Sequence, residues 1–177
     1  PFSRIAEQLL SDAHDGAAVL LCTSCTGALE LAAMTLGIGP GDVVAVPSFT
    51  FPSTASAFAR TGARLRFIDI DPNTLGMDAD HLAEQLDHRV KAVVPVHYAG
   101  RQASIGAVCA AADRVGAQVV EDNAHGMFGA HGGKALGTFG SMSTLSFHET
   151  KNFICGEGGA LVINDRSHSE NAELLLH

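Results

Sequence analysis

The sequence predicts an α/β fold, a mostly parallel sheet with helices on both faces. Seven short runs are nearly continuous in apolar and β-branched residues, which is typical of strands buried on both faces. Segments with helical character lie between most of these runs, as crossovers between parallel strands require. Pro95 lies within the fourth run and cannot donate to a ladder, so we expect the ladder to end there. The predicted strands are 19–22, 43–47, 65–70, 92–97, 118–122, 143–148 and 160–164.

The helix after the first strand has the clearest end signals. Segment 27–36 is rich in good helix formers, with Ser24 or Thr26 as the N-cap and Gly37 as the stop. Two further helices and three turns follow from spacing and from glycine and proline. The helices are 78–86 and 104–115, and the turns are 40–41, 71–73 and 132–133.

Composition limits the classes of protein. The chain has 177 residues, 46% hydrophobic and 17% charged, which suits a globular domain with a sizeable core and argues against disorder. A net charge of -8 argues against a nucleic-acid surface. No apolar run approaches the ~20 residues that span a bilayer, so we expect no membrane partner. Any anionic ligand must be held by local donors.

The cysteines and histidines do not predict a metal site. Cys22 and Cys25 have C-x-x-C spacing, which allows redox or zinc chemistry, but a second pair is missing. We therefore interpret them, with Cys109 and Cys155, as incidental thiols of a reducing, cytoplasmic environment. His148-Glu149 resembles the start of H-E-x-x-H, but Asn152 stands in place of the second histidine.

Polar residues follow five of the predicted strands. Because ligands of such sheets bind outside the carboxyl ends of the strands, these residues are expected at one edge. They supply small residues at a helix start, aromatic rings, a carboxylate and a lysine. The segments are 23–27, 48–51, 97–98, 121–125 and 148–151.

The small residues at 24–28 predict an anion site. Backbone N–H groups at a helix N-terminus and the helix dipole both favour an anion, and the Ser24 and Thr26 hydroxyls can add contacts. The alternative is a plain N-cap. The sequence lacks the G-x-x-x-x-G-K-[ST] pattern, so this is not a Walker loop. The glycines at 37, 39 and 41 follow a helix, which does not fit a dinucleotide fingerprint.

Lys151 and Asp122 are the candidate catalytic residues. Lys151 is one of three lysines, and it follows the apolar run 142–147. Asp122 ends a predicted buried strand. Taken singly, each has an ordinary alternative, a surface lysine or a structural carboxylate. Together with the anion site they suggest pyridoxal phosphate, which needs a phosphate cradle, a partner for its ring nitrogen and a Schiff-base lysine.

Five motifs carry a resemblance to a known family. "SCTGALELAA", "PSFTFPSTASAFA", "VPVHYAG", "VVEDNAHG" and "SFHETKN" followed by "GEGGA" are similar to those of the DegT-type sugar aminotransferases. These enzymes have the type I fold of pyridoxal-phosphate enzymes. The resemblance covers residues 17 to 165, and it implies a seven-stranded sheet with one antiparallel member, 160–164.

The resemblance assigns a role to each matching position. Lys151 matches the Schiff-base lysine, and Asp122 matches the partner of the pyridine nitrogen. His125 matches a position near the cofactor ring, and Phe51 matches the aromatic residue stacked on it. The positions that match phosphate ligands are Ser24, Cys25, Thr26 and Ser146. Related dehydratases carry histidine in place of this lysine, so Lys151 argues against that branch.

The resemblance also implies a reaction and an assembly. We expect an amino group to pass from an amino acid, glutamate in this family, to a nucleotide-linked 4-keto-6-deoxyhexose, with a TDP-sugar expected. A homodimer with shared sites is implied, with Phe49, His97 and Tyr98 as candidates for its rim. Residues 1–177 then form an incomplete large domain, without the family's small C-terminal domain. An amino-acid aminotransferase or lyase of the same fold, and a non-catalytic binding or assembly module, remain as alternatives.

Overall fold

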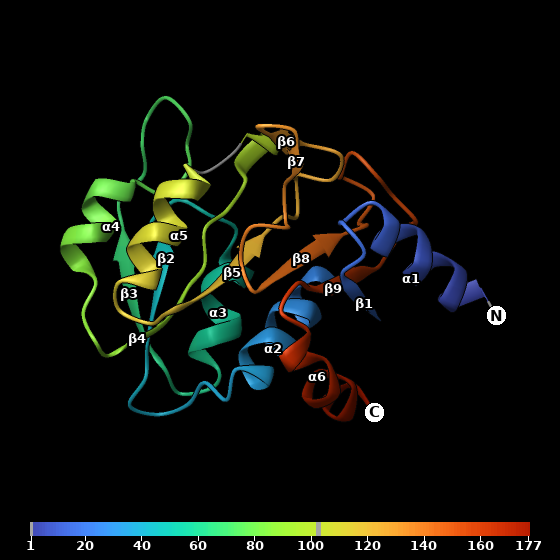
Figure 1. Ribbon diagram of the computed structural model, residues 1–177, viewed down its shortest axis with the longest axis horizontal. Helices are drawn as coiled ribbons and strands as arrows, with labels where there is room; N and C mark the ends of the chain where they lie inside the picture. The colour runs from blue at the N-terminus through green and yellow to red at the C-terminus, as the bar shows by residue number, and fades with distance from the viewer. Residues whose placement is uncertain (1, 102–103) are drawn as a thin grey trace.

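One seven-stranded sheet organises the residues that the computed structural model describes, 2–101 and 104–177 (Figure 1). The strand order is β1-β9-β8-β5-β4-β2-β3. The strands are β1 (Ala18–Cys22), β2 (Val43–Pro47), β3 (Arg64–Ile68), β4 (Val90–Val93), β5 (Gln118–Asp122), β8 (Met142–Ser146) and β9 (Gly159–Ile163).

Strand β9 is the antiparallel member of this sheet, as predicted. It pairs antiparallel with β1 on one side and β8 on the other, whereas the other neighbouring pairs in the sheet are parallel. The carboxyl ends of the parallel strands therefore meet the start of β9 at one edge.

Helices cover both faces of the sheet, which confirms the predicted layers. Buried residues of α2 (Cys25–Thr35), α3 (Pro52–Ala59) and α6 (Ser169–Leu176) form one cluster with alternate strand residues such as Val44 and Val46. Strand residues of the opposite parity, such as Val43 and Ala45, pack with α4 (Ala79–Gln85) and α5 (Ile105–Asp113). Helix α1 (Phe2–Asp12) covers the β1, β8 and β9 end of that second face through Leu10.

The predicted end signals lie where the sequence places them. The Ser24 hydroxyl caps α2 by accepting a hydrogen bond from the Gly27 N–H at 3.1 Å. Gly37 follows the helix with a φ of +61°, the left-handed conformation that favours glycine. Strand β4 ends at Val93, before Pro95, but the pairing with β5 does not stop there: the Pro95 carbonyl accepts from the Asp122 N–H at 2.8 Å, and Val96 forms an isolated parallel bridge with Asp122.

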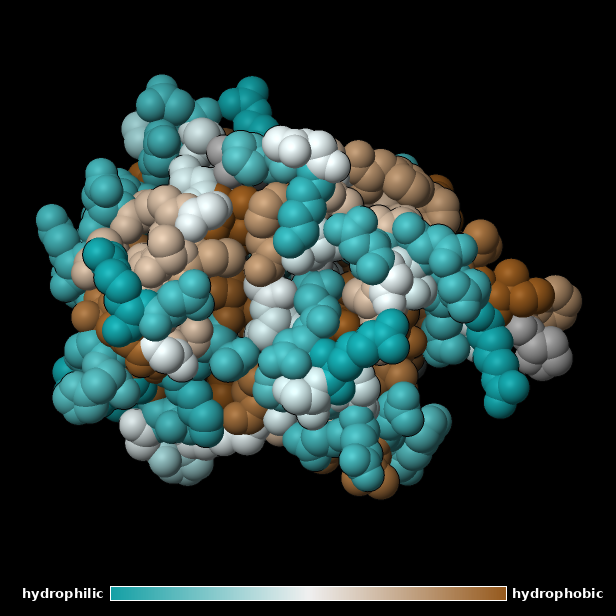
Figure 2. All heavy atoms as spheres, in the orientation of Figure 1, coloured by the Kyte–Doolittle hydropathy of each residue, from teal (hydrophilic) through white to brown (hydrophobic). Residues whose placement is uncertain are grey.

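Sequence reasoning missed three elements. The turn at 132–133 closes a small hairpin of β6 (Ala130–His131) and β7 (Lys134–Ala135). Helix α3 begins with proline at its first position, a favourable start signal. Helix α1 has apolar residues Phe2, Ile5 and Leu9 at helical spacing, and they are 85%, 57% and 65% exposed. Figure 2 shows hydrophobic residues on the surface where α1 projects from the rest of the molecule. None of the described helices combines the length and apolar character needed to cross a bilayer.

Glu121 is a fully buried carboxylate at the end of β5. Its Oε1 accepts hydrogen bonds from the Phe139 and Gly140 N–H groups, both at 2.7 Å. Its Oε2 lies 2.7 Å from His97 Nε2 and accepts from the Gly137 N–H at 3.0 Å. This one side chain therefore ties β5 to the segment before β8 and to His97, four residues beyond the end of β4.

We expect Glu121→Gln to lower the free energy of unfolding by about 3 kcal/mol. Each carboxylate oxygen of Glu121 faces two nitrogen atoms. In glutamine an NH₂ group replaces one of these oxygens, so a donor would face N–H donors and their hydrogen bonds would be lost. Urea denaturation followed by circular dichroism measures the change. Glu173→Gln, on an exposed carboxylate of α6, is the matched control and should change it by less than about 0.5 kcal/mol. Equal effects of the two substitutions would contradict the role given to Glu121.

Candidate active site

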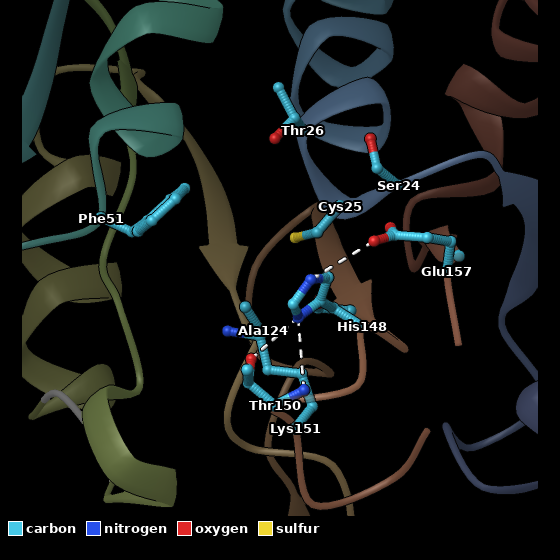
Figure 3. Close-up of a pocket in the computed structure, with 11 residues that line it drawn as sticks. Ser24, Cys25, Thr26, Phe51, Ala124, His148, Thr150, Lys151 and Glu157 are labelled. Carbon is cyan, nitrogen blue, oxygen red and sulfur yellow. Dashed lines mark hydrogen bonds and ion pairs between the residues drawn. The ribbon is translucent and has the colours of Figure 1, made fainter. Parts of the chain in front are cut away.

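A cavity of about 370 Å³ opens at the carboxyl edge of the sheet (Figure 3). Four structural parts surround it: the start of α2, the residue before α3, the segment after β5, and the end of β8 with the loop that follows it. The residues that line it are Ser24, Cys25, Thr26, Phe51, Ala124, Ser146, His148, Thr150, Lys151, Glu157 and Gly158. Six of these were predicted as site residues from the sequence, so the fold brings them together although they lie up to 127 positions apart (151 − 24).

The N-terminus of α2 forms one wall of the cavity. Gly159, the first residue of β9, lies so close that a Cβ at this position would overlap the Ser24–Cys25 peptide. The close approach packs the first turn of α2 against the end of the sheet. Ser146, the last residue of β8, pairs with Gly159 in the ladder and is 8% exposed. Backbone donors and a serine hydroxyl thus border the same space, an arrangement that suits an anion.

Helix α3 is joined to α2 through Thr26, a predicted site residue, and Ser53, which the sequence analysis did not identify. The Thr26 and Ser53 hydroxyl oxygens lie 2.8 Å apart, which connects the first turns of the two helices. Phe51 is the N-cap residue of α3, and its ring is 70% exposed where it faces the cavity. An exposed ring at the cavity mouth supplies a face on which a planar ligand can stack.

Lys151 lies on a loop that is held by hydrogen bonds around His148. The His148 Nδ1 accepts from the Thr150 N–H at 3.2 Å and lies 2.9 Å from the Thr150 hydroxyl. Because Nδ1 accepts, Nε2 carries the ring proton and faces Glu157 Oε1 at 3.3 Å. The Lys151 N–H in turn donates to the His148 carbonyl at 3.0 Å. The loop therefore presents the Lys151 amine to the cavity from a defined turn.

The amines of the other two lysines make contacts outside this cavity. Lys91 Nζ donates to the Gly37 carbonyl at 2.9 Å, at the amino end of the parallel strands. Lys134 Nζ lies 4.7 Å from the centre of the Phe139 ring. Among the described lining residues, the amine comes from Lys151.

Asp122 is buried behind the cavity wall. Its exposed fraction is 4%. Its Oδ2 accepts from the Thr54 hydroxyl at 2.6 Å, and its Oδ1 accepts from the Ala124 N–H at 3.1 Å. Ala124 lines the cavity directly, so the carboxylate lies just behind that lining. Both oxygens of this buried carboxylate therefore have a hydrogen-bond donor.

Burial and the nearby Asp122 carboxylate both affect the pKa of the Cys25 thiol. Burial, and next the Asp122 carboxylate, raise the pKa of the Cys25 thiol, which donates to Thr144 Oγ1 at 3.4 Å. Cys25 is therefore a neutral thiol at pH 7. This agrees with the interpretation of the C-x-x-C pair as incidental, and all four cysteines are free.

His125 lies beside Tyr98, at the edge of the site. The two ring centres are 5.4 Å apart, and the His125 Nδ1 accepts from the Ala99 N–H at 3.3 Å. Burial lowers the pKa of His125, the Lys151 ammonium lowers it further, and Asp122 opposes both. The ring is thus neutral at pH 7, with its proton on Nε2 as a donor.

Of the three rim candidates, Phe49 and Tyr98 are at least partly exposed, whereas His97 is fully buried. The rings of Phe49 and Tyr98 lie 4.9 Å apart, and Phe49 is 44% exposed. His97 is fully buried against Glu121, so it cannot border an open edge. The alternative, packing at a strand end, holds for His97 because its ring satisfies a buried carboxylate.

Comparison with known proteins places this chain among aminotransferases. The family model described as "DegT/DnrJ/EryC1/StrS aminotransferase family" matches residues 2–177. The "Spore coat polysaccharide biosynthesis protein SpsC" of Bacillus subtilis (strain 168) is 41% identical over 152 residues, which are 86% of this chain and 39% of that protein. The chain thus spans well under half the length of this relative.

Solved structures agree with the family match. The structure of 3-amino-5-hydroxybenzoic acid (AHBA) synthase has a TM-score of 0.92 and 36% identity, covering 97% of this chain and 45% of that one. A Streptococcus pneumoniae protein has been solved in a PLP form and a PMP form. Its PLP form has a TM-score of 0.91 and 26% identity, covering 98% of this chain and 48% of that one.

We expect an NMR titration to place the His125 midpoint below 6.5, its ordinary value. Below that value the unfolded chain binds more protons at this residue than the folded chain, so stability falls as the pH drops through the folded pKa. Because burial is the largest cause, Lys151→Met should raise the midpoint only part of the way. His125→Gln should remove this part of the pH dependence of unfolding. A midpoint at or above 6.5 would contradict the described surroundings of the ring.

Proposed function

We propose, on the premise that this chain belongs to the DegT/DnrJ/EryC1/StrS aminotransferase family, that the protein transfers an amino group to a nucleotide-linked ketosugar. One observation supports the chemistry most directly. The Lys151 amine, the first turn of α2 and Ser146 line one cavity, and the Asp122 carboxylate lies just behind its wall. That set of groups suits a planar, phosphorylated aldehyde with a basic ring nitrogen.

Pyridoxal 5'-phosphate is the cofactor of the family, and the cavity residues fit it. We assign its phosphate to the first turn of α2, with the Ser24, Cys25 and Thr26 backbone, and to Ser146. Gly159 supports this assignment, because any larger residue there would displace the Ser24–Cys25 peptide. We assign the ring face to Phe51 and a position beside the ring to His125, whose Nε2 is a donor.

Each catalytic assignment follows from the chemistry of a side chain. When bound, the cofactor supplies an electron sink for the carbon that loses a proton. The Asp122 carboxylate holds a proton at the ring nitrogen, since its two oxygens are fixed by Thr54 and Ala124. The Lys151 amine would hold the cofactor through its aldehyde carbon and, once released as a neutral amine, its nitrogen would accept the proton from the α-carbon of the amino donor. The neutral His125 adds a hydrogen-bond donor without adding a charge.

The substrate proposal rests on the relatives. We propose glutamate as the amino donor and a nucleotide-linked 4-keto-6-deoxyhexose, as a TDP-sugar, as the acceptor. A relative named for spore coat polysaccharide biosynthesis supports a sugar acceptor. A net charge of -8 means that the nucleotide diphosphate must be held by local donors. The free cysteines fit a reducing compartment, and we propose the cytoplasm.

We further propose that the active protein is a homodimer. The cavity is open in this chain, Phe51 is 70% exposed, and Phe49 is 44% exposed. Amino-group transfer requires a site from which water is largely excluded. We propose that a second subunit covers this edge, with Phe49 and Tyr98 at the rim. Residues 1–177 form the cofactor-binding large domain in this proposal, and a small C-terminal domain completes the protein.

We expect borohydride treatment of the full-length protein, loaded with pyridoxal phosphate, to fix the cofactor to Lys151. The amine of Lys151 borders the cavity, whereas Lys91 contacts the Gly37 carbonyl and Lys134 lies over Phe139. Mass spectrometry of the digest locates the adduct. Lys151→Arg should abolish the adduct, and Lys134→Arg should leave it unchanged. An adduct on Lys91 or Lys134 would overturn the assignment.

We expect turnover with glutamate and a TDP-linked 4-keto-6-deoxyhexose, and little with simple 2-oxo acids other than 2-oxoglutarate. A coupled assay of the full-length protein measures both, and sedimentation should show a dimer. A monomer that is active on many 2-oxo acids would indicate an amino-acid aminotransferase of the same fold. Elimination from an amino acid would indicate a lyase. Cofactor binding with neither reaction would indicate a non-catalytic module.

A further inference from the structure

A chain of hydroxyl groups runs from the edge of the site to the Asp122 carboxylate. The Thr54 Oγ1 donates to Asp122 Oδ2 at 2.6 Å, and it lies 2.8 Å from the Thr50 Oγ1. Thr54 is fully buried, Asp122 is 4% exposed, and Thr50 is half-buried. The motif "PSFTFPSTASAFA" contains both threonines, but neither was identified from the sequence as a functional residue.

The direction of these hydrogen bonds is fixed by the carboxylate. An ionised carboxylate only accepts, so the single Thr54 hydroxyl proton is directed to Asp122. The Thr54 oxygen is then left as an acceptor, and the Thr50 hydroxyl must donate to it. Both protons therefore point toward Asp122. With the Ala124 N–H on the other oxygen, the carboxylate is held at both of its oxygens.

The same turn of α3 carries the residue assigned to the ring face. Phe51 is the N-cap of α3, Thr54 lies three positions later, and the Thr54 N–H donates to the Phe51 carbonyl at 3.1 Å. The aromatic face and the support of the carboxylate therefore belong to one rigid turn. A movement of this turn therefore shifts Phe51 and the Thr54 donor to Asp122 together.

We propose that Thr54, supported by Thr50, is a positioning residue. It orients the Asp122 carboxylate toward the ring nitrogen of the cofactor and fixes the position of that carboxylate relative to the Phe51 ring. This inference rests on the proposed function. A carboxylate with one oxygen unsupported rotates about its terminal bond, which is a soft torsion, and spends less time directed at the nitrogen. A hydrogen bond to a charged group is also among the stronger ones in a protein.

Paired substitutions at Thr54 separate its hydroxyl from its methyl group. Thr54→Val keeps the shape and removes the donor, whereas Thr54→Ser keeps the donor and removes the methyl. In the full-length protein with pyridoxal phosphate, Thr54→Val should slow the half-reaction with glutamate by about tenfold or more, since a bond to a charged group is lost. It should also reduce the induced circular dichroism of the bound cofactor, which reports how the ring is held. Thr54→Ser should restore both to within about twofold.

Thr61→Val is the matched control, just beyond the opposite, C-terminal end of α3. Its hydroxyl donates to the Phe58 carbonyl at 2.7 Å, remote from the carboxylate, so both readouts should stay unchanged. Thr50→Val should have a smaller effect, about twofold to fivefold, and no further effect in the Thr54→Val background, because the chain is already broken. Asp122→Asn gives the reference for a lost charge. Should Thr54→Val fail to fold, Thr50→Val and Thr54→Ser still decide the question.

Borohydride trapping on Lys151 separates the two proposals. An adduct on Lys151 in wild type and in Thr54→Val, with the predicted loss of dichroism and rate in Thr54→Val, supports the inference. An adduct in both with unchanged dichroism and rate would overturn the inference and leave the proposed function intact. Loss of both readouts in Thr54→Ser but not in Thr54→Val would also overturn it, because the methyl group would then matter. Lack of a Lys151 adduct in wild type would overturn the proposed function itself.

Discussion

The carboxyl end of β5 carries two adjacent carboxylates, and the site depends on how they are satisfied. Successive side chains of a strand point to opposite faces, so Glu121 and Asp122 need separate sets of donors. Glu121 obtains its donors from His97 and from the segment that enters β8. Asp122 obtains its donors from α3 and from the Ala124 N–H. An unsatisfied buried carboxylate is costly, and these bonds fix the strand end from both faces.

Close backbone approach completes the site around this fixed point. The start of β9 reaches the first turn of α2 because Gly159 has no side chain to prevent it. The Thr26 and Ser53 hydroxyls then join the first turns of α2 and α3. The loop after β8 closes on itself through His148, Thr150 and Glu157, and it presents Lys151. Helix N-termini, a strand end and a loop therefore meet at one cavity.

The electrostatics of the cavity are local. The chain carries a net charge of -8, so an anion at α2 depends on backbone donors and on the nearby Lys151. The same lysine helps to lower the pKa of His125, and Asp122 helps to raise the pKa of the Cys25 thiol. Burial is the larger cause in both cases. Both side chains are consequently neutral at pH 7, and the charged side chains at the proposed cofactor position are Lys151 and Glu157 in the cavity lining and Asp122 just behind it.

The sequence by itself determined the layers of the fold, the antiparallel strand β9, the Ser24 cap, and the placement of Lys151 and Asp122 at the same edge. The layers, a cap at Ser24 or Thr26 and the shared edge follow from local periodicity, from helix end signals and from the rule that parallel strands end together, whereas the antiparallel strand was implied by the family resemblance. Only the tertiary structure decided that His97 is buried, that Glu121 joins three segments, and that Thr54 supports Asp122. His97 and Glu121 are 24 positions apart in the sequence, Glu121 and Phe139 are 18 apart, and Thr54 and Asp122 are 68 apart. No local sequence pattern encodes pairs at such separations. A side chain's hydrogen-bond partner depends on which distant segments the folded backbone brings to it, and that is decided only when the layers pack.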